Sequence, residues 1–269
     1  MKKALLLTLV TGLLLVGCGK KAPESAVDVA AAQQRSAAAS AATEKLAADA
    51  GSETSDRADP TLERVAALPE SGQLPGGKWK AGQHYLPVVP AQGTSAQPGD
   101  VEVLEVFWFG CGHCYALDPF LENWLKSKPA YIKFVRVPVM WGPVHRAHAR
   151  LFYTLQALGQ LDSLFGPTFD EIQTRNNPLV DADEGKTLKM QLAYARSKGI
   201  AETDFNREYN GFFVNQALQR ADDVTRRYKV EGVPSIVING KYQTDVAMAG
   251  GHEQLIALIN DMAAAEKKR

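Results

Sequence analysis

Aromatic residues are absent from the first 78 positions of this 269-residue chain, and all 10 Phe, 4 Trp and 8 Tyr follow from Trp79 onward. Between Gly19 and Gly76 the chain is dominated by Ala, Ser, Gln, Asp and Glu. Such a composition buries too little apolar area to offset the entropy that is lost on ordering. We therefore predict a disordered linker over residues 18–77, acting as a tether, and one folded domain over residues 78–269.

An excess of charge of either sign is also absent, because 30 Lys and Arg residues balance 30 Asp and Glu residues. A nucleic acid partner is therefore not expected, since binding to phosphate groups depends on an excess of basic residues. A second long apolar run is missing as well. Any membrane attachment would then depend on the N-terminus and not on a spanning helix.

The long apolar run that the chain does have covers residues 4–16 and follows Met1-Lys2-Lys3, a basic start that is typical of an export signal. We predict a signal peptide over residues 1–17, which is too short to span a bilayer. Its last residues and the next one, Leu15-Val16-Gly17-Cys18, are similar to the lipobox of bacterial lipoproteins. This similarity implies that Cys18 becomes a lipid-modified N-terminus that anchors the protein in the periplasm. The alternative is an ordinary cleaved signal peptide that leaves Cys18 as a free thiol.

Cysteine is scarce, with three residues in all, and two of them stand in residues 109–115, Phe-Gly-Cys-Gly-His-Cys-Tyr. This segment directly follows the apolar run 101–108, which indicates a buried strand that leads into the start of a helix. Unpaired N–H groups and a partial positive charge at a helix N-terminus lower the pKa of a thiol. We therefore predict Cys111 as the nucleophile of a redox dithiol. Cys114, within one helical turn, would attack a mixed disulfide formed at Cys111.

The pattern after Trp79 predicts an α/β domain in which a helical segment interrupts a sheet. Expected helices cover residues 111–126 and 252–267, and Asn239-Gly240 is a hairpin signal. Between Trp141 and Tyr228 apolar residues recur at helical spacing. Proline and glycine residues divide that stretch into four or five helices, within which we place an insertion at about 142–212. The expected strands are 83–88, 101–108, 132–137, 235–239 and 241–244, and the residues expected to divide the insertion into helices are Pro143, Gly159, Pro167, Pro178 and Gly199.

Four local features of residues 78–267 resemble the DsbA family of periplasmic thiol-disulfide oxidoreductases. They are the lead-in 104–110, the Cys-Gly-His-Cys-Tyr motif, the helical insertion, and the segment 230–235 before a strand that ends in Asn239-Gly240. The resemblance implies a thioredoxin-like fold with an inserted all-helical domain that caps the redox site. It also implies that Pro234 has a cis peptide bond and, with Val233 before it, faces Cys111 and Cys114.

The DsbA resemblance further implies a thiol:disulfide oxidoreductase that donates a disulfide to exported proteins. Reduced exported proteins would be the substrates, and a DsbB-like membrane oxidase would recharge the site. No cofactor and no metal are expected, and we expect a monomer, because the linker lacks the apolar content to form a dimerisation domain.

The dipeptide between the two cysteines departs from the best-known DsbA proteins, which carry Pro-His where this chain has Gly-His. Gly-His is typical of protein disulfide isomerase. The retained His113 lies next to Cys111, where an imidazole stabilises a thiolate and thereby makes the disulfide a stronger oxidant. We predict that His113 tunes the site and that the protein is a milder oxidant than the Pro-His form.

Other residues also attract a functional interpretation. Glu105 lies in the apolar run before the motif, where a carboxyl group would have a raised pKa and relay protons to Cys114. Its place in the run also allows it to point elsewhere. His145 and His148, three residues apart, are interpreted as solvent-facing helix positions in preference to metal ligands. Trp108, Phe109 and Trp141 are assigned to the core or to groove walls.

Three alternative functions remain open. A disulfide isomerase or reductase would use the same site, although the linker offers no dimerisation domain of the kind an isomerase uses. A periplasmic metal-binding thiol chaperone would use Cys111, Cys114 and His113 as ligands for Cu(I) or Zn, but this leaves Pro234 unexplained. A structural disulfide in an inert lipoprotein domain is disfavoured, because so small a loop restricts the unfolded chain little.

Overall fold

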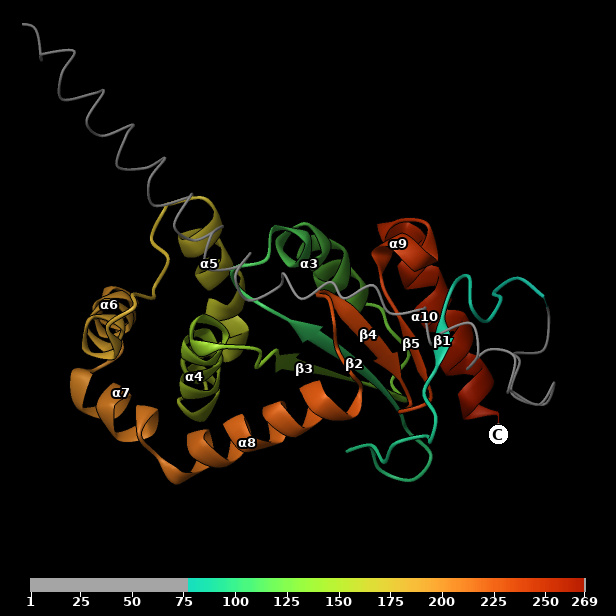
Figure 1. Ribbon diagram of the computed structural model, residues 1–269, viewed down its shortest axis with the longest axis horizontal. Helices are drawn as coiled ribbons and strands as arrows, with labels where there is room; N and C mark the ends of the chain where they lie inside the picture. The colour runs from blue at the N-terminus through green and yellow to red at the C-terminus, as the bar shows by residue number, and fades with distance from the viewer. Residues whose placement is uncertain (1–76, 269) are drawn as a thin grey trace, which may run out of the picture. The chain divides into compact units, whose positions relative to one another are not determined.

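The computed structural model describes residues 77–268, and a five-stranded sheet lies at its centre (Figure 1). The strand order is β1-β5-β4-β2-β3, in which β2 and β3 are parallel and the other neighbours are antiparallel. Every residue of β2 is buried, including Glu102 and Glu105, as the mostly apolar run predicts. The strands are β1 (Leu86–Pro87), β2 (Val101–Phe107), β3 (Ile132–Pro138), β4 (Ser235–Ile238) and β5 (Tyr242–Thr244).

The first strand is shorter than the sequence predicts. Gly82 has a φ of 79°, and its N–H donates to the Tyr85 carbonyl at 2.8 Å, so that residues 82–85 form a turn. The prediction of a strand from residue 83 is therefore wrong, because residues 83–85 belong to this turn and do not pair with β5. Only Leu86 and Pro87 pair with β5.

The predicted hairpin between β4 and β5 is confirmed. Asn239 and Gly240 have φ values of 51° and 65°, and the N–H of Lys241 donates to the Ile238 carbonyl at 3.0 Å. Two central residues with positive φ define the turn type that matches the twist of paired strands. Gly240 is required for a second reason, since a Cβ atom there would lie 2.1 Å from the Gln92 carbonyl oxygen.

Two long helices cover one face of the sheet, and both are where the sequence predicts them. They are α3 (Gly112–Leu125) and α10 (His252–Lys267), and a short helix α9 (Val246–Ala249) precedes α10. Alternate residues of β2 point to this face, where they pack against apolar side chains of both helices. The core on this side includes Val101, Val103, Leu117, Leu121, Ile132, Ile236, Leu255, Leu258 and Ile259.

Five helices lie between β3 and β4, in agreement with the predicted four or five. Pro167 lies inside one of them, α5, so the expectation that it separates two helices is wrong. The residue before this proline, Gly166, has no Cβ atom that could clash with the proline ring. The proline lacks one backbone N–H donor, but the helix continues on both sides of it. The insertion is predicted to end at about residue 212, and the fifth of these helices, α8, starts at that residue. The five are α4 (Pro143–Ala157), α5 (Leu161–Gln173), α6 (Glu184–Ser197), α7 (Glu202–Tyr209) and α8 (Phe212–Arg227).

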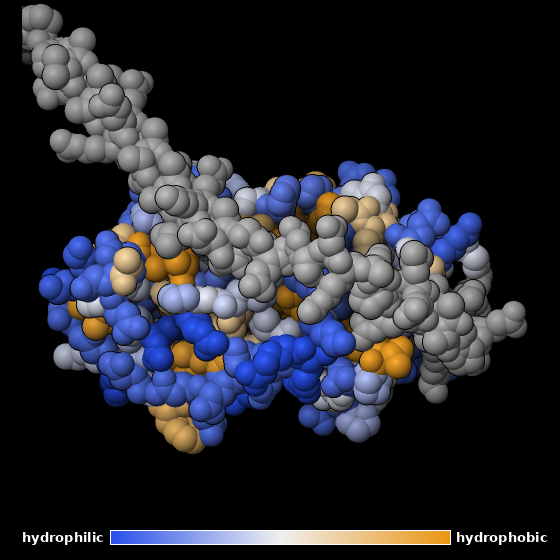
Figure 2. Space-filling view, in the orientation of Figure 1, coloured by the Kyte–Doolittle hydropathy of each residue, from blue (hydrophilic) through white to orange (hydrophobic). Residues whose placement is uncertain are grey.

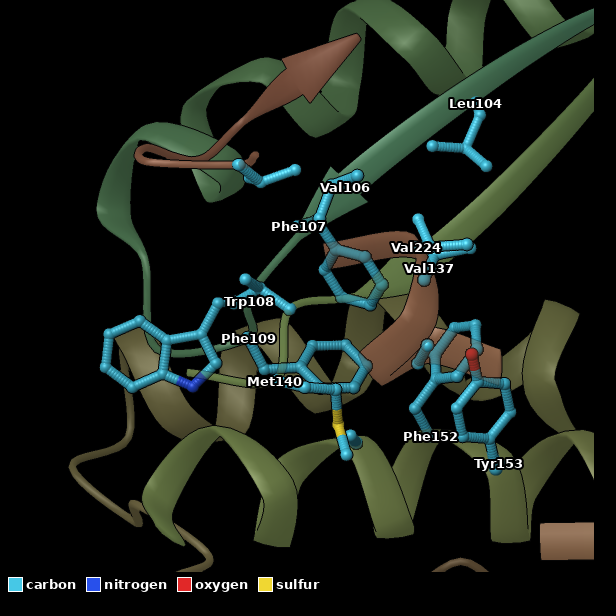
Figure 3. Packing of buried hydrophobic residues seen from close by; sticks show 14 of the residues in the cluster. Leu104, Val106, Phe107, Trp108, Phe109, Val137, Met140, Phe152, Tyr153 and Val224 are labelled. Atoms are coloured by element: carbon cyan, nitrogen blue, oxygen red, sulfur yellow. The ribbon is translucent and has the colours of Figure 1, made fainter. Parts of the chain in front are cut away.

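Aromatic side chains join this helical segment to the end of β2 (Figure 3). The ring of Phe107, with no exposed surface, lies 5.3 Å from that of Phe152 on α4 and 5.1 Å from that of Phe165 on α5. The ring of Phe109 lies 5.0 Å from that of Phe169, also on α5. Because aromatic pairs at these ring distances add to the free energy of area burial, the helices are held firmly against the segment that leads to the cysteines.

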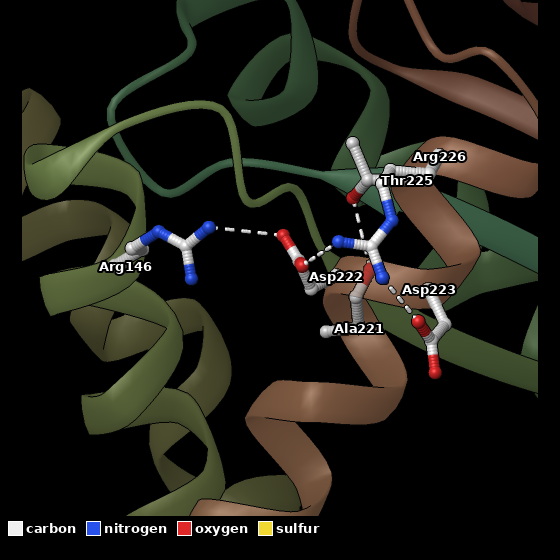
Figure 4. Close-up of polar contacts among 6 residues, drawn as sticks. All are labelled: Arg146, Ala221, Asp222, Asp223, Thr225 and Arg226. Carbon is white, nitrogen blue, oxygen red and sulfur yellow. Dashed lines mark hydrogen bonds and ion pairs between the residues drawn. The ribbon is translucent and has the colours of Figure 1, made fainter.

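Ion pairs at the surface connect α4 with α8. Arg146 of α4 contacts Asp222 of α8 at 3.0 Å, and Arg226 contacts Asp222 and Asp223 on α8 itself (Figure 4). Exposed pairs of this kind contribute about 0–1 kcal/mol each, so the apolar contact between the helices dominates. The face shown in Figure 2 is mostly hydrophilic, with small apolar patches between the charged side chains.

No helix among residues 77–268 is both long enough and apolar enough to cross a membrane. The predicted signal peptide, the linker and Cys18 all lie outside the described residues.

The packing of Phe107 generates a stability prediction. Phe107→Ala is expected to lower the free energy of unfolding by about 3–5 kcal/mol, because the substitution removes a fully buried ring and leaves a cavity. Denaturant unfolding of the folded domain measures this change. Phe212→Ala is the matched control, because the ring of Phe212 is 76% exposed and its loss should change the free energy by less than about 0.5 kcal/mol. Equal effects of the two substitutions would contradict the described core.

Candidate active site

Cys111 lies at the junction of strand and helix that the sequence predicts. It is the N-cap residue of α3, with extended backbone angles (φ −91°, ψ 116°), and its N–H donates to the Trp108 carbonyl at 3.0 Å. Cys114 lies in the first turn of the same helix and has no exposed surface, whereas Cys111 is half-buried. Both are free thiols, and only one of them is open to a partner protein.

The pKa of the Cys111 thiol is lowered to about 6. The largest cause is a hydrogen bond from the Cys114 side chain, and backbone N–H groups of Cys114 and His113 add to it against the opposing effect of burial. The charge of His113, an exposed residue, lowers the pKa further. These are the unpaired N–H groups that every helix leaves at its start, so the helix end itself stabilises the thiolate.

Cys114 behaves in the opposite way. Burial raises its pKa well above the ordinary value, and the hydrogen bond and negative charge that it meets at Cys111 raise it further, with a contribution from Glu105. At neutral pH the site therefore holds one thiolate and one thiol. This division is what a nucleophilic cysteine and a resolving cysteine require.

The loop before β4 faces Cys111. The peptide bond between Val233 and Pro234 is cis, as the DsbA resemblance implies. The Cys111 sulfur lies 3.3 Å from the Val233 carbonyl oxygen, to which it donates when it is protonated. The sheet register brings these residues together, because Val106 of β2 pairs with Ser235 at the start of β4. One antiparallel strand pair thus brings Cys111 and Val233 into contact, although they are 122 residues apart in sequence.

Glu105 points to the α3 side of the sheet and is 2% exposed. Burial raises its pKa to about 7, although Arg136 opposes this effect with a contact of 3.0 Å between Nε and the carboxylate. Arg136 also contacts Asp118 at 2.8 Å, and burial raises the pKa of Asp118 to about 6. Of these two carboxyl groups, Glu105 acts on the buried sulfur of Cys114 through its charge, and Asp118 is connected to Glu105 through Arg136.

Arg136 and Asp118 are not among the site residues predicted from the sequence, although each left a signal there. Arg136 is a basic residue inside an apolar strand, at the register position opposite Glu105. Asp118 follows Cys114 by four residues, so the two share one face of α3. Paired charges inside two neighbouring apolar runs are a pattern that a search of the sequence for buried ion pairs would find.

Hydrogen bonds attach the helical insertion to both sides of the cysteine motif. The side-chain amide of Gln173 donates to the Phe109 carbonyl at 2.8 Å, on the strand side of the motif. On the helix side, the hydroxyl of Tyr115 donates to Asp170 at 2.9 Å. Both partners lie on α5, so one helix braces the loop before Cys111 and the helix after it.

His145 and His148 are buried, at 3% and 2% exposure, and the expectation that they face solvent is wrong. They lie on the face of α4 that packs against Trp108, whose indole N–H donates to Nδ1 of His148 at 2.9 Å. Trp108 and Phe109 belong to the core, as predicted, whereas Trp141 is 37% exposed. Among residues 77–268 no group of three or more His, Cys, Asp or Glu side chains is placed to hold a metal ion.

Comparisons with known proteins agree on one family. A family model described as a DSBA-like thioredoxin domain matches residues 132–260. Thiol:disulfide interchange protein DsbA of Pseudomonas aeruginosa is 32% identical over 191 residues, which cover 71% of this chain and 86% of that protein. The protein of the same name from Pseudomonas syringae pv. tomato is 31% identical over 188 residues, or 70% of this chain and 85% of that protein. The crystal structure of Pseudomonas aeruginosa DsbA matches with a TM-score of 0.64 over 71% of this chain and 95% of that one.

These matches confirm the predicted thioredoxin-like fold and the predicted class of reaction. Identity above 30% extends over most of each curated relative, and both carry the name of a thiol:disulfide interchange protein. The two thiols with opposite pKa shifts at the start of α3 supply chemistry of that kind. The chain belongs to the DsbA family and is a thiol:disulfide oxidoreductase.

Proposed function

We propose that this protein oxidises exported proteins by donating to them a disulfide between Cys111 and Cys114. The observation that carries the proposal is the inequality of the two sulfurs at one helix start. Cys111 is accessible and has a lowered pKa, while Cys114 is buried and has a raised one. A thiol with a low pKa is a good leaving group, and its stability in the reduced form makes the disulfide oxidising.

The reaction begins with the oxidised pair and a substrate thiolate. The thiolate attacks the Cys111 sulfur, the bond between Cys111 and Cys114 breaks, and Cys114 leaves with the electron pair and takes up a proton. A second substrate thiolate then attacks the substrate sulfur of the mixed disulfide and releases Cys111 as a thiolate. The substrate loses two electrons and the two protons of its thiols. The enzyme gains both electrons and one proton, at Cys114, and ends as a Cys111 thiolate and a Cys114 thiol, while the other proton goes to the solvent.

Glu105 is proposed as the source of the proton that Cys114 takes up. With a pKa of about 7, a large share of the Glu105 carboxyl groups is protonated at neutral pH. The charge of the ionised form raises the pKa of the Cys114 thiol. Arg136 holds the carboxyl group in place through its contact at 3.0 Å. A proton can be given in one half of the reaction and recovered in the other, because the pKa lies close to the working pH.

The loop at Val233 and Pro234 is proposed to bind the substrate chain. An extended segment can pair with the backbone of Val233 as an added strand would, and Pro234 has no N–H that would compete. The Val233 carbonyl already lies 3.3 Å from the Cys111 sulfur, so a paired substrate would hold its own sulfur near the point of attack. His113, exposed beside Cys111, is proposed to tune the stability of the thiolate.

We further propose that the reaction takes place in the periplasm, with the protein acting as a monomer held at a membrane by a lipid on Cys18. The N-terminal pattern that resembles an export signal and a lipobox supports this placement. An oxidising compartment is also where a disulfide donor can act. Recharging is assigned to a DsbB-like membrane oxidase that accepts electrons from the Cys111 and Cys114 dithiol.

Substitution of the two cysteines separates their roles. Cys111→Ser is expected to abolish oxidation of a reduced peptide with two cysteines, because no sulfur remains for the substrate to attack. When it is incubated with the disulfide form of the peptide, Cys114→Ser is expected to accumulate mixed disulfides at Cys111, because the Cys111 thiolate attacks the peptide disulfide and the resolving sulfur is gone. Mass spectrometry of the intact adducts and the rate of peptide oxidation measure both effects. Rapid peptide oxidation by Cys111→Ser would contradict the mechanism.

The lowered pKa of Cys111 predicts a pH dependence of stability. Cys111 has a pKa of about 6 when folded and about 8.5 when unfolded, so the unfolded chain binds more protons between these values. Relative to the oxidised protein, the free energy of unfolding of the reduced protein should rise by about 1–2 kcal/mol between about pH 6 and pH 8. This added stability of the reduced protein should be lost as the pH falls through about 6. Denaturant unfolding of both forms at several pH values measures this difference, and parallel curves would contradict it.

The role of Glu105 is tested by Glu105→Gln, which keeps the shape of the side chain and removes its titration. The breakdown of the mixed disulfide by Cys114, in which Glu105 would take the proton back, is expected to slow by roughly a hundredfold, the lower end of the range for loss of an acid or base group. Stopped-flow measurement with a single-cysteine peptide follows this step. Glu122→Gln is the matched control, because Glu122 contacts the same Arg136 but has a half-exposed side chain. Equal slowing in both variants would refute a specific proton relay.

A further inference from the structure

Trp108 connects the helical insertion to both sulfurs of the active site. Its backbone carbonyl accepts the N–H of Cys111 at 3.0 Å. A backbone hydrogen bond from the same residue lowers the pKa of Cys114, against the larger effect of burial. The position of the Trp108 backbone therefore affects the electrostatic environment of each cysteine.

The indole of Trp108 packs directly on the loop that leads to Cys111. A Cβ atom at Gly110 would lie 2.3 Å from Cζ2 of Trp108 and 2.5 Å from Cε2, so the ring rests on the Gly110 backbone. Trp108 is 7% exposed and stands with Phe109 at the end of β2 (Figure 3). Because a ring in such close contact cannot tilt without displacing the loop, the loop and the ring move as one body.

His148 fixes the other side of this ring, and both of its nitrogens are used. Nδ1 accepts the indole N–H of Trp108 at 2.9 Å, and Nε2 lies 2.7 Å from the Pro178 carbonyl, to which it donates. Both bonds together require the neutral imidazole with its proton on Nε2. Burial lowers the pKa of His148 to about 4, so this form persists through the pH range in which Cys111 titrates.

We propose that His148 is a positioning residue for disulfide exchange, because it holds the Trp108 indole on Gly110 and thereby fixes the loop that carries Cys111. The inference rests on the proposed function and assigns part of it to α4 of the insertion. Loss of the hydrogen bond leaves a buried indole N–H without a partner, which favours movement of the ring. The loop then follows, and the N–H groups at the start of α3 are less well aligned with the Cys111 sulfur.

His145 provides a matched control on the same helix. Its ring also contacts Trp108, with ring centroids 4.5 Å apart, and it is 3% exposed. Its Nδ1, however, is one of the buried atoms without a hydrogen-bond partner in the described part of the chain. His145→Phe therefore removes a buried imidazole from the same contact and breaks no bond to Trp108, whereas His148→Phe breaks that bond.

The test is a titration of the Cys111 thiolate by its ultraviolet absorbance in the reduced protein. His148→Phe is expected to raise the midpoint by about one pH unit, a roughly tenfold change in the ionisation constant. His145→Phe should leave the midpoint unchanged. His148→Gln, which retains an acceptor and a donor, should lie between His148→Phe and the unmodified protein. A midpoint that is equal in His148→Phe and the unmodified protein would overturn the proposal.

A double-mutant cycle separates positioning from a general loss of structure. Trp108→Phe keeps a ring on Gly110 and lacks the N–H, so it should raise the midpoint as His148→Phe does. This variant also serves as the test if His148→Phe does not fold. In the Trp108→Phe background, His148→Phe should add no further change, and an undiminished change there would refute the proposal. Peptide oxidation by the unmodified protein tests the proposed function separately, so failure of one is distinguishable from failure of the other.

Discussion

The arrangement of the active site depends on hydrogen bonds to one sulfur at the start of α3. The Cys114 thiol and the N–H groups of His113 and Cys114 all favour the anionic form of Cys111. The rest of the domain keeps these donors in place. The buried strand β2 fixes the point at which the helix begins, and the aromatic contacts with α4 and α5 hold the segment between strand and helix.

The second sulfur gains its properties from the same geometry. Cys114 lies one helical turn further into the protein, where burial suppresses its ionisation. Its surroundings also include the Glu105 carboxyl group, and Arg136 limits the rise in the pKa of that group. A single helix start thus creates a pair of unlike thiols from two like residues, and the Glu105 charge beneath the helix acts on the inner one.

Much of this was predictable from the sequence, and the failures have physical causes. The start of α3, the hairpin at Asn239 and the helix α10 follow from local signals, since the residues themselves carry the conformational preference. The burial of His145 and His148 does not, because a histidine on an amphipathic helix gives no sign of which aromatic side chain it will meet. Closure of the distance between Cys111 and Val233 depends on strand register, and only the family resemblance supplied it.

The two glycines beside Cys111 differ in what they allow. A side chain at Gly110 would collide with the indole of Trp108, whereas a Cβ atom at Gly112 would meet no atom nearer than 4.0 Å, the Oε1 of Gln173. Evolution can therefore vary the residue between the cysteines without repacking the domain, while the residue before them is fixed by sterics. This difference leaves the dipeptide as the place where natural selection, or a protein engineer, can adjust the oxidising strength of the scaffold and preserve its architecture.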